Sequence, residues 1–283
     1  MTRLLLLGGE HAHVHMLAEL ARRRIDGWEV RLITPYRRQI YSGMLPGWIA
    51  GHYRIEACAI ALDQLADAAS VDLRQTAGVA LDLSSNALHC ADGRDVAFDL
   101  LSIDTHPMPA LGDLPSAQAH ALPVRSIESF IATWRLLVDR MPERRHRFDP
   151  VILGAGAAGA ELALALAIQH RAAHEGWSHL RPTVAGTDDL PMPGMPDATR
   201  RHAARLLTQR NIAWLGARRA CRIDANAIAF KNGAPLSFDA CLVSTGGKHA
   251  LATWGRWSWS GNWVWRLKDR IDRAFMRQFG TMA

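Results

Sequence analysis

Apolar and polar residues alternate along the chain in blocks, and the first blocks predict a strand, a helix and a second strand. Arg3 to Gly8 is an apolar run that predicts a buried parallel strand. Leu17, Leu20 and Ile25 recur at helical spacing after it, and Trp28 to Thr34 is again largely apolar. A strand that enters glycines and is followed by a helix and another strand is typical of an open α/β sheet.

The same pattern occurs a second time further along the chain. At an offset of 140 residues the copies match in three places: Asn86–Leu88 with Asn226–Ile228, Asp92-Gly93 with Asn232-Gly233, and Phe98–Thr105 with Phe238–Thr245. The Asp-Gly and Asn-Gly pairs favour hairpin turns, so each copy should contain antiparallel strands that lead into a final parallel strand. We therefore expect an α/β protein with two Rossmann-like dinucleotide-binding domains, each with a parallel sheet and a β-meander crossover.

A proline-rich stretch separates the two copies. His106 to Pro123 contains four prolines, which is typical of a linker. We expect residues 1–112 to form the first dinucleotide-binding domain and residues 113–247 the second. Residues 248–283 then either complete the first domain or contact a membrane.

The second copy carries an intact fingerprint for a dinucleotide diphosphate. Gly154, Gly156 and Gly159 follow an apolar strand and open an Ala/Leu-rich helix, which is the context that this motif requires. The alternative is a tight turn without a ligand. The next predicted strand, Arg181 to Thr187, ends where an acidic residue usually accepts the ribose hydroxyls, and Asp188-Asp189 follows it. This favours NADH over NADPH without deciding between them.

The first copy carries only part of this fingerprint. Gly8 and Gly9 are present, but Glu10 and His13 stand at the second and third glycine positions. His11, His13 and His15 could suggest a metal site, yet no nearby carboxylate or cysteine completes a ligand set, so we expect no metal. The simpler interpretation is a polar helix start whose first histidine approaches a ligand phosphate.

A glycine- and proline-containing segment, Tyr41 to Gly47, follows the second strand. Loops at the carboxyl ends of parallel strands commonly bind ligands in open α/β sheets. A purely structural turn explains the same residues equally well. The sequence leaves both interpretations open.

Composition indicates a globular protein of about two domains. Of the 283 residues, 49% are hydrophobic, yet the longest apolar runs, Leu4–Leu7 and Ala163–Ile168, are far shorter than the roughly 20 residues of a membrane span. We expect a cytoplasmic protein. The cysteines, Cys58, Cys90, Cys221 and Cys241, form no CxxC pair, so neither a redox dithiol nor a zinc cluster is expected.

The positive charge is concentrated only near the C-terminus. A net charge of +6 and a pI near 9.6 suit phosphates or anionic lipid, but the basic residues are mostly scattered, which disfavours nucleic acid. Five of the ten tryptophans lie between Trp254 and Trp265 and suggest an aromatic hairpin, followed by a basic amphipathic helix from Arg266 to Phe279. Such a helix suits an anionic membrane surface, or it docks on the protein's own sheet or on a second copy in a homodimer.

Four segments together resemble one family of flavoproteins: Leu7–Val14, Tyr41–Gly47, Val151–Glu161 and Trp265–Met276. The chain is similar to the two-dinucleotide-binding-domain flavoproteins of the pyridine nucleotide-disulfide oxidoreductase superfamily. It most resembles the NADH-dehydrogenase-like branch that also occurs fused to selenide, water dikinase. This branch is related to type II NADH dehydrogenases and sulfide:quinone oxidoreductases.

The resemblance implies two cofactors and an electron-transfer reaction. FAD would be held in the first domain, with Gly8, Gly9 and His11 at its diphosphate and Ser42, Gly43 and Pro46 near the flavin. NAD(P)H would be held in the second domain by Gly154, Gly156, Gly159 and Glu161, with Thr245 and Gly246 at the domain crossover. Hydride would pass from nicotinamide to flavin, and electrons would pass on to an acceptor such as a quinone.

Three features depart from the family pattern. Glu10 replaces a glycine, and His106 stands where the second copy has Gly246. Relatives also carry a segment with a Gly-Asp pair that holds the ribitol of the flavin, whereas here Ser244–Gly247 runs directly into Lys248–Trp254. The chain therefore resembles an internally shortened member. The alternative function is a non-catalytic NAD(P)-binding protein that has lost flavin.

Overall fold

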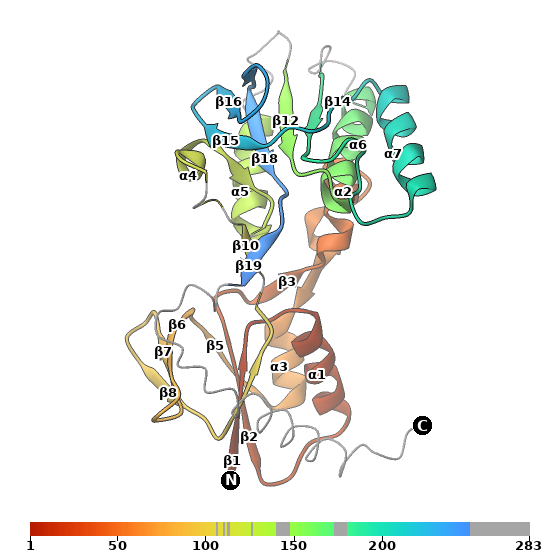
Figure 1. Ribbon diagram of the computed structural model, residues 1–283. Coiled ribbons are helices and arrows are strands. Elements are labelled where there is room, and N and C mark those ends of the chain that lie inside the picture. The colour runs from red at the N-terminus through yellow and green to blue at the C-terminus, as the bar shows by residue number, and fades with distance from the viewer. Residues whose placement is uncertain are drawn as a thin grey trace. The chain divides into compact units, whose positions relative to one another are not determined.

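The chain folds into two compact units, each of which is described by itself (Figure 1). The structure is a computed structural model that describes residues 1–105, 107–109, 111, 114–125, 127–139, 148–172 and 180–249. Within these residues the first unit contains Met1–Arg37 and Ala61–Thr105, and the second contains Arg38–Ile60 and His106–His249. Residues 38–60 group with the second unit, although the residues on either side of them belong to the first.

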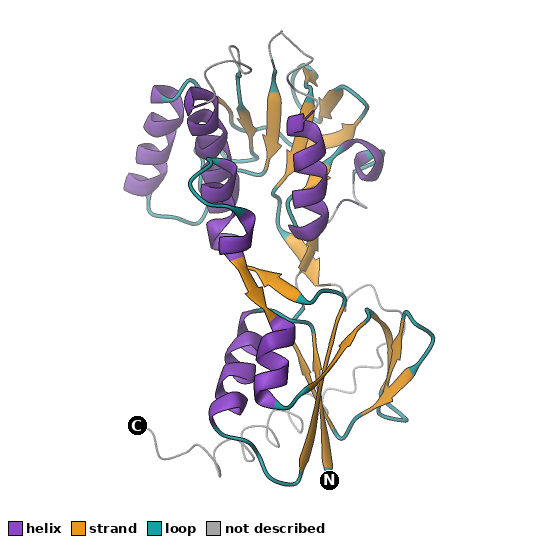
Figure 2. Ribbon diagram, turned by 180° about the vertical axis from the view of Figure 1, so that it is seen from behind, coloured by secondary structure: helices purple, strands orange, loops and turns teal. Residues whose placement is uncertain are grey.

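The first unit is built on a parallel sheet with the strand order β5-β2-β1-β9. These strands are β1 (Thr2–Leu7), β2 (Trp28–Thr34), β5 (Asp72–Gln75) and β9 (Leu100–Ile103). Two helices and a three-stranded meander complete the unit: α1 (His11–Arg22), α3 (Leu62–Ala69), β6 (Gly78–Asp82), β7 (Ala87–Cys90) and β8 (Asp95–Ala97). The helices lie on one side of the sheet and the meander on the other (Figure 2).

The central strand β1 is apolar throughout its buried part because both of its faces are covered. Leu6 packs in an apolar cluster with residues of α1 and α3. Leu5 and Leu7 point the other way and pack with residues of the meander. Successive side chains of a strand alternate between faces, so a strand between two covering layers needs apolar residues at every position.

The second unit has a five-stranded parallel sheet with the order β11-β18-β12-β13-β14. Its strands are β11 (Leu122–Pro123), β12 (Pro150–Leu153), β13 (Thr183–Ala185), β14 (Ala213–Leu215) and β18 (Ala240–Val243). The remaining elements are α4 (Ala117–His120), α5 (Ile127–Asp139), α6 (Ala157–Ala172), α7 (Asp197–Gln209), β15 (Ala220–Ile223), β16 (Ala227–Phe230) and β17 (Leu236–Ser237). Ile152 faces the helices, and its neighbours on β12 face the meander.

The two units repeat one topology, which confirms the fold class predicted from the sequence. The order β14-β13-β12-β18 corresponds strand by strand to β5-β2-β1-β9, and β11 is an additional edge strand. Matching backbone hydrogen bonds also recur: Asp104 N–H donates to Leu7 O over 2.8 Å, and Ser244 N–H donates to Leu153 O over 2.8 Å. The expected hairpin turns are present as well, with Gly93 at φ +78° and Gly233 at φ +99°.

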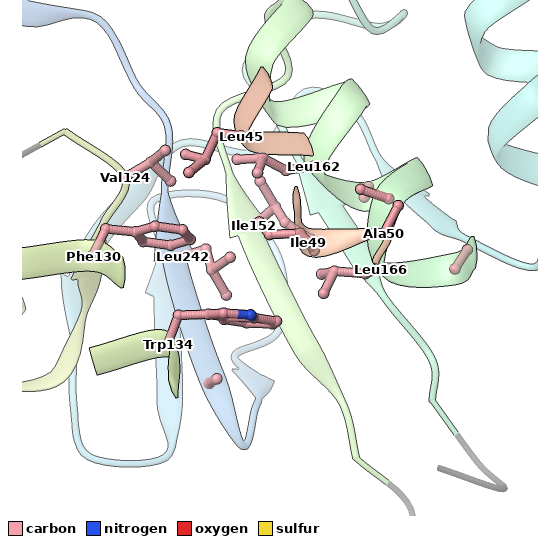
Figure 3. Packing of buried hydrophobic residues seen from close by; sticks show 14 of the residues in the cluster. Leu45, Ile49, Ala50, Val124, Phe130, Trp134, Ile152, Leu162, Leu166 and Leu242 are labelled. Carbon is pink, nitrogen blue, oxygen red and sulfur yellow. The ribbon is translucent and has the colours of Figure 1, made fainter. Parts of the chain in front are cut away.

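Residues 38–60 form a small structure that packs into the core of the second unit. They comprise β3 (Arg38–Ile40), the 3-10 helices η1 (Ser42–Met44) and η2 (Ile55–Cys58), α2 (Leu45–Ile49) and the start of β4 (Ala59–Ala61). Leu45 and Ile49 lie against Leu162 and Leu166 of α6, opposite Phe130 and Trp134 of α5 (Figure 3). Arg38 of β3 and Glu128 of α5 form a bidentate ion pair, with Nε 2.7 Å from Oε1 and Nη2 2.8 Å from Oε2.

This packing accounts for the apolar character of α6. Buried residues occur on several sides of the helix, including Ala160, Leu162, Ala163, Ala165 and Leu166. A helix that is apolar nearly all round must be covered on more than one side. The sheet covers one side of α6 and α2 covers another.

The second unit also contains a short antiparallel ribbon. It pairs β10 (Pro107–Pro109) with β19 (Gly247–His249). Within the described part of the chain, every helix is too short or too polar to cross a membrane. The aromatic hairpin, the C-terminal helix and the departure at His106 lie outside the described residues.

Candidate dinucleotide-binding site

The turn between β12 and α6 is shaped by a glycine with no room for a side chain. Gly154 has φ +108°, and a Cβ atom there would lie 2.5 Å from the carbonyl oxygen of Ser244. Its N–H donates to Ala185 O over 2.9 Å, which continues the sheet into the turn. The chain therefore turns sharply where β12 ends and directs the first turn of α6 toward the carboxyl edge of the sheet.

The other two glycines of the motif have different tasks. A Cβ atom on Gly159 would overlap the carbonyl oxygen of Gly154, so this glycine allows α6 to begin directly against the end of β12. At Gly156 a Cβ atom would meet no heavy atom within 4 Å. Open space thus lies at the residue just before α6, where helix N–H groups and the helix dipole favour an anion. The geometry fits the diphosphate of a dinucleotide.

The remaining predicted residues of this site are positioned less tightly. The Thr245 backbone passes beside Gly154, since a Cβ on that glycine would lie 2.8 Å from Thr245 N. At Gly246, which follows, an added Cβ atom would meet no heavy atom within 4 Å. Glu161 is exposed on α6. The structure thus places Thr245 beside the glycine turn and leaves Glu161 at the helix surface.

The acidic residues after β13 belong to a loop that is fixed by an arginine. Asp188 Oδ1 lies 3.6 Å from Arg200 Nη2, and the Thr187 hydroxyl donates to Asp188 Oδ2 over 3.3 Å. Arg200 also donates to the carbonyl oxygens of Leu190 at 3.1 Å and Pro191 at 3.4 Å. One guanidinium therefore fixes the loop that follows β13.

Two further contacts beside this turn were not foreseen from the sequence. Met192 N–H donates to Ala155 O over 2.6 Å, which holds the proline-rich loop against the glycine turn. The indole N–H of Trp214 donates to Asp189 O over 2.9 Å. Neither residue carries a recognisable signal, because a methionine in a Pro-rich loop and a tryptophan in a short strand are common in many settings.

The first copy has the same turn. Gly8 has φ +94°, and a Cβ atom there would overlap the carbonyl oxygen of Asp104. Its N–H donates to Ile33 O over 2.8 Å, as Gly154 N–H donates to Ala185 O. A Cβ on Gly9 would lie 2.5 Å from Leu62 Cδ1, so this glycine is also required by packing. The turn itself therefore fits a dinucleotide-binding unit.

The start of α1 differs from the start of α6. Val14 N–H donates to Glu10 O, just as Ala160 N–H donates to Gly156 O, so Glu10 and Gly156 hold equivalent positions before the helix. By the same spacing His13 holds the position of Gly159. The third glycine of the motif is thus replaced by a histidine in the first unit.

His13 is fully buried and bonded on both sides of its ring. Nδ1 lies 2.6 Å from Gly8 O and Nε2 lies 2.9 Å from the hydroxyl of Ser102. Because a carbonyl oxygen only accepts, Nδ1 carries the proton and Nε2 accepts from the serine hydroxyl in the neutral ring. Burial lowers the pKa of His13, which favours this neutral form.

A carboxylate of the protein itself lies at the start of α1. Asp104 Oδ2 accepts a hydrogen bond from the backbone N–H of His13 over 2.9 Å. The second unit has Ser244 at the equivalent position after β18. The glycine turn of the first unit therefore matches that of the second, but at the helix start a carboxylate accepts from the N–H of His13.

The histidines of α1 do not gather around one point. His11 and His15 are exposed, whereas His13 is buried beneath the helix. Among the described residues, His, Cys, Asp and Glu side chains form no group of three that could hold a metal ion. His11 is the first residue of α1, at the end of the helix where the resemblance places the FAD diphosphate.

The glycines of the Tyr41–Gly47 segment lie against neighbouring aromatic rings. Ser42, Gly43 and Pro46 belong to the second unit, whereas Gly8, Gly9 and His11 belong to the first. A Cβ on Gly43 would lie 3.1 Å from the Tyr41 ring, and a Cβ on Gly47 would overlap the Tyr53 ring. Both glycines therefore lie directly beside tyrosine rings, and a cofactor contact at this segment stays a prediction.

Replacing Gly47 by alanine should be less favourable in the unmodified chain than in a Tyr53→Ala background, because the added methyl overlaps the Tyr53 ring, which must move. With the ring removed, the replacement should stabilise the second unit by about 0.5–1 kcal/mol, because Gly47 lies inside α2 and alanine is the better helix former. Thermal unfolding of the four proteins of this double-mutant cycle measures the difference. An equal effect of the replacement in both backgrounds would show that the ring does not oppose the added side chain.

The cysteines have the environment of core residues. Burial raises the pKa of the Cys241 thiol to about 12, and it also raises the pKa of the Cys58 and Cys90 thiols. Cys221 is partly buried, and its thiol contacts Ala229 O. Thiolate chemistry is therefore suppressed at the buried cysteines.

The chain is similar in structure to several oxidoreductases. No protein family and no curated protein matches the sequence. NDH2 from Plasmodium falciparum in complex with NADH matches 88% of this chain and 56% of its own, with a TM-score of 0.77 and 12% identity. The water-forming NADH oxidase from Lactobacillus brevis bound to NADH matches 87% of this chain and 54% of its own, with a TM-score of 0.70 and 14% identity. The sulfide:quinone oxidoreductase from Aquifex aeolicus matches 90% and 61%, with a TM-score of 0.65 and 15% identity.

These matches confirm the predicted resemblance at the level of the fold. The chain spans between 54% and 61% of the length of these three proteins. Identities between 12% and 15% carry the architecture and not the chemistry. The chain therefore shares a two-domain α/β fold with these oxidoreductases.

Proposed function

We propose that the chain binds a nicotinamide dinucleotide in its second unit and acts as an NAD(P)H-dependent oxidoreductase. The observation that carries the proposal is the open space at Gly156, directly before the N-terminus of α6. Gly154 and Gly159 aim this helix end by excluding side chains from the turn. Backbone N–H groups at such a helix end bind a diphosphate without any charged side chain.

The reaction is inferred from the proteins that share the fold. We propose FAD as the hydride acceptor and a quinone-like compound as the final electron acceptor. When bound, a flavin can accept a hydride from nicotinamide and pass electrons on to a quinone. NDH2 and the NADH oxidase were solved with NADH, and the A. aeolicus protein is a sulfide:quinone oxidoreductase, which supports this class of reaction.

The acceptor has a proposed location as well. A quinone is reached from a membrane surface, and the basic, Trp-rich tail has the composition of a peripheral membrane segment. Removing residues 266–283 should reduce sedimentation of the protein with anionic liposomes. Equal sedimentation of both forms would rule out the anchor.

A second candidate is an NAD(P)-binding protein that carries no flavin. The contact between Asp104 and the His13 N–H favours it, because it places a negative charge at the helix end that would meet the flavin diphosphate. The second unit has Ser244 in place of this aspartate. Both candidates share the nicotinamide site and differ only in the first unit.

One experiment tests the shared claim and separates the candidates. We expect the purified full-length chain to bind NADH, with a change in NADH fluorescence on titration. Oxidised-flavin absorption bands that are bleached by NADH would support the oxidoreductase. A colourless protein that incubation with FAD leaves unchanged would contradict it and favour the second candidate. Failure to bind NADH or NADPH would contradict both.

A further inference from the structure

We propose that Asp104 competes with a flavin dinucleotide for the first cradle, which is the glycine turn at Gly8 together with the start of α1. Its carboxylate lies at the N-terminus of α1 and opposes binding of the dinucleotide there. The proposal rests on the flavin part of the proposed function and identifies a residue that lowers flavin affinity. It concerns only the first unit. Nicotinamide binding in the second unit is independent of it.

The equivalence of the two units identifies Asp104 as one of three differences between their turns, beside Glu10 and His13. Gly8 and Gly154 share a positive φ and the same bond to the neighbouring strand. The strands β9 and β18 also end in the same way, with Asp104 N–H bonded to Leu7 O and Ser244 N–H to Leu153 O. Asp104 and Ser244 therefore occupy one position in the repeated architecture, and only the first carries a charge.

The carboxylate already makes the kind of contact that a phosphate makes. Asp104 Oδ2 accepts from the N–H of His13, the third residue of α1, over 2.9 Å. Dinucleotide phosphates bind to N–H groups in the first turn of such a helix. A bound diphosphate would thus lie within a few ångströms of a like charge, where repulsion is strong. The carboxylate also offsets part of the positive charge at the N-terminus of α1 that would attract the phosphates of the ligand.

His13 keeps the carboxylate in this position. In the second unit a Cβ at Gly159 would overlap Gly154 O, so a residue with a side chain cannot take that position with the same backbone placement. His13 stands at the equivalent position of the first unit, and its ring is bonded to Gly8 O and to the Ser102 hydroxyl. Because the ring is buried and bonded at both nitrogens, it fixes the start of α1 and with it the N–H that Asp104 accepts.

Flavin affinity measured on charge variants tests the proposal. Asp104→Asn keeps a side-chain oxygen for the His13 N–H but removes the charge, and Asp104→Ser introduces the residue of the second unit. Asp67→Asn, on the exposed surface of α3, removes the same charge elsewhere in the first unit. All proteins are full-length and are titrated with FAD, with quenching of flavin fluorescence as the readout.

We expect Asp104→Asn to bind FAD at least about tenfold more tightly than the unmodified chain, equivalent to about 1.4 kcal/mol. Asp104→Ser should bind more tightly as well, and Asp67→Asn should match the unmodified chain. Equal or weaker binding by both Asp104 variants, with their circular dichroism intact, would overturn the proposal. Absence of flavin binding by every form would overturn it together with the flavin part of the proposed function.

A parallel titration with NADH keeps the two claims apart. The Asp104 variants should bind NADH as the unmodified chain does, because the nicotinamide cradle lies in the other unit. Loss of NADH binding by all forms would contradict the proposed function while leaving the FAD comparison valid. A gain in FAD affinity alone would support competition by Asp104 whatever the final electron acceptor is.

Discussion

Gly156→Glu is expected to weaken NADH binding at least about 100-fold, equivalent to about 2.7 kcal/mol. A Cβ atom at this position meets no heavy atom within 4 Å, so we expect the protein to fold normally. The new carboxylate would enter the space in front of α6, where it repels the diphosphate and competes for the helix N–H groups. The first unit already has glutamate at the equivalent position, Glu10.

The measurement is a titration of NADH fluorescence, with circular dichroism to verify folding. Ala132→Glu is a matched control, because Ala132 is exposed on α5 of the same unit and the substitution adds the same charge. This control should bind NADH normally. Unchanged binding by Gly156→Glu would show that the diphosphate is not held at this turn.

The architecture could be predicted because its constraints are local. Glycines are required where the backbone turns with positive φ, as at Gly8, Gly154 and the two hairpin turns. The apolar runs of β1 and β12 follow from strands covered on both faces. Since each of these constraints acts on a few neighbouring residues, the repeated order of strands, helix and meander is visible in the sequence.

The placement of residues 38–60 could not be predicted in the same way. Leu45 and Ile49 provide an apolar helix face, but an apolar face does not identify the surface that it will cover. A signal was present on the partner: α6 is apolar on more than one side, so something besides the sheet had to cover it. The pairing of these elements is a long-range contact, and no local pattern specifies it.

The candidate site likewise contains residues that the sequence could predict and residues that it could not. Gly154, Gly156 and Gly159 form a local motif at a single turn of the chain. Asp104 was aligned with Ser244 by the repeat, but whether its side chain points to the helix depends on the join of two separate elements. Arg200 is one of several arginines in α7, and its bonds to Leu190 O and Pro191 O have no sequence signature.

Ile49→Ala should lower the free energy of unfolding of the second unit by about 2–5 kcal/mol, the range for truncation of a buried large aliphatic side chain. Ile49 is 1% exposed and lies against Leu162 and Leu166 of α6 (Figure 3). Its loss leaves a cavity between α2 and the helix that carries the dinucleotide cradle. Leu136→Ala is the control, because Leu136 on α5 is 59% exposed and its truncation should cost less than about 0.5 kcal/mol.

Hydrogen exchange measured by mass spectrometry distinguishes the units in one experiment. Peptides from β12 and α6 should exchange faster in Ile49→Ala, because opening of the second unit becomes less costly. Peptides from β1 and β2 should be unchanged, since residues 38–60 pack in the second unit and not in the first. Faster exchange in β1 and β2 with none in β12 would assign this segment to the first unit. Another part of the protein would then have to pack on the apolar face of α6 that α2 contacts, because a helix so apolar is not stable in contact with water.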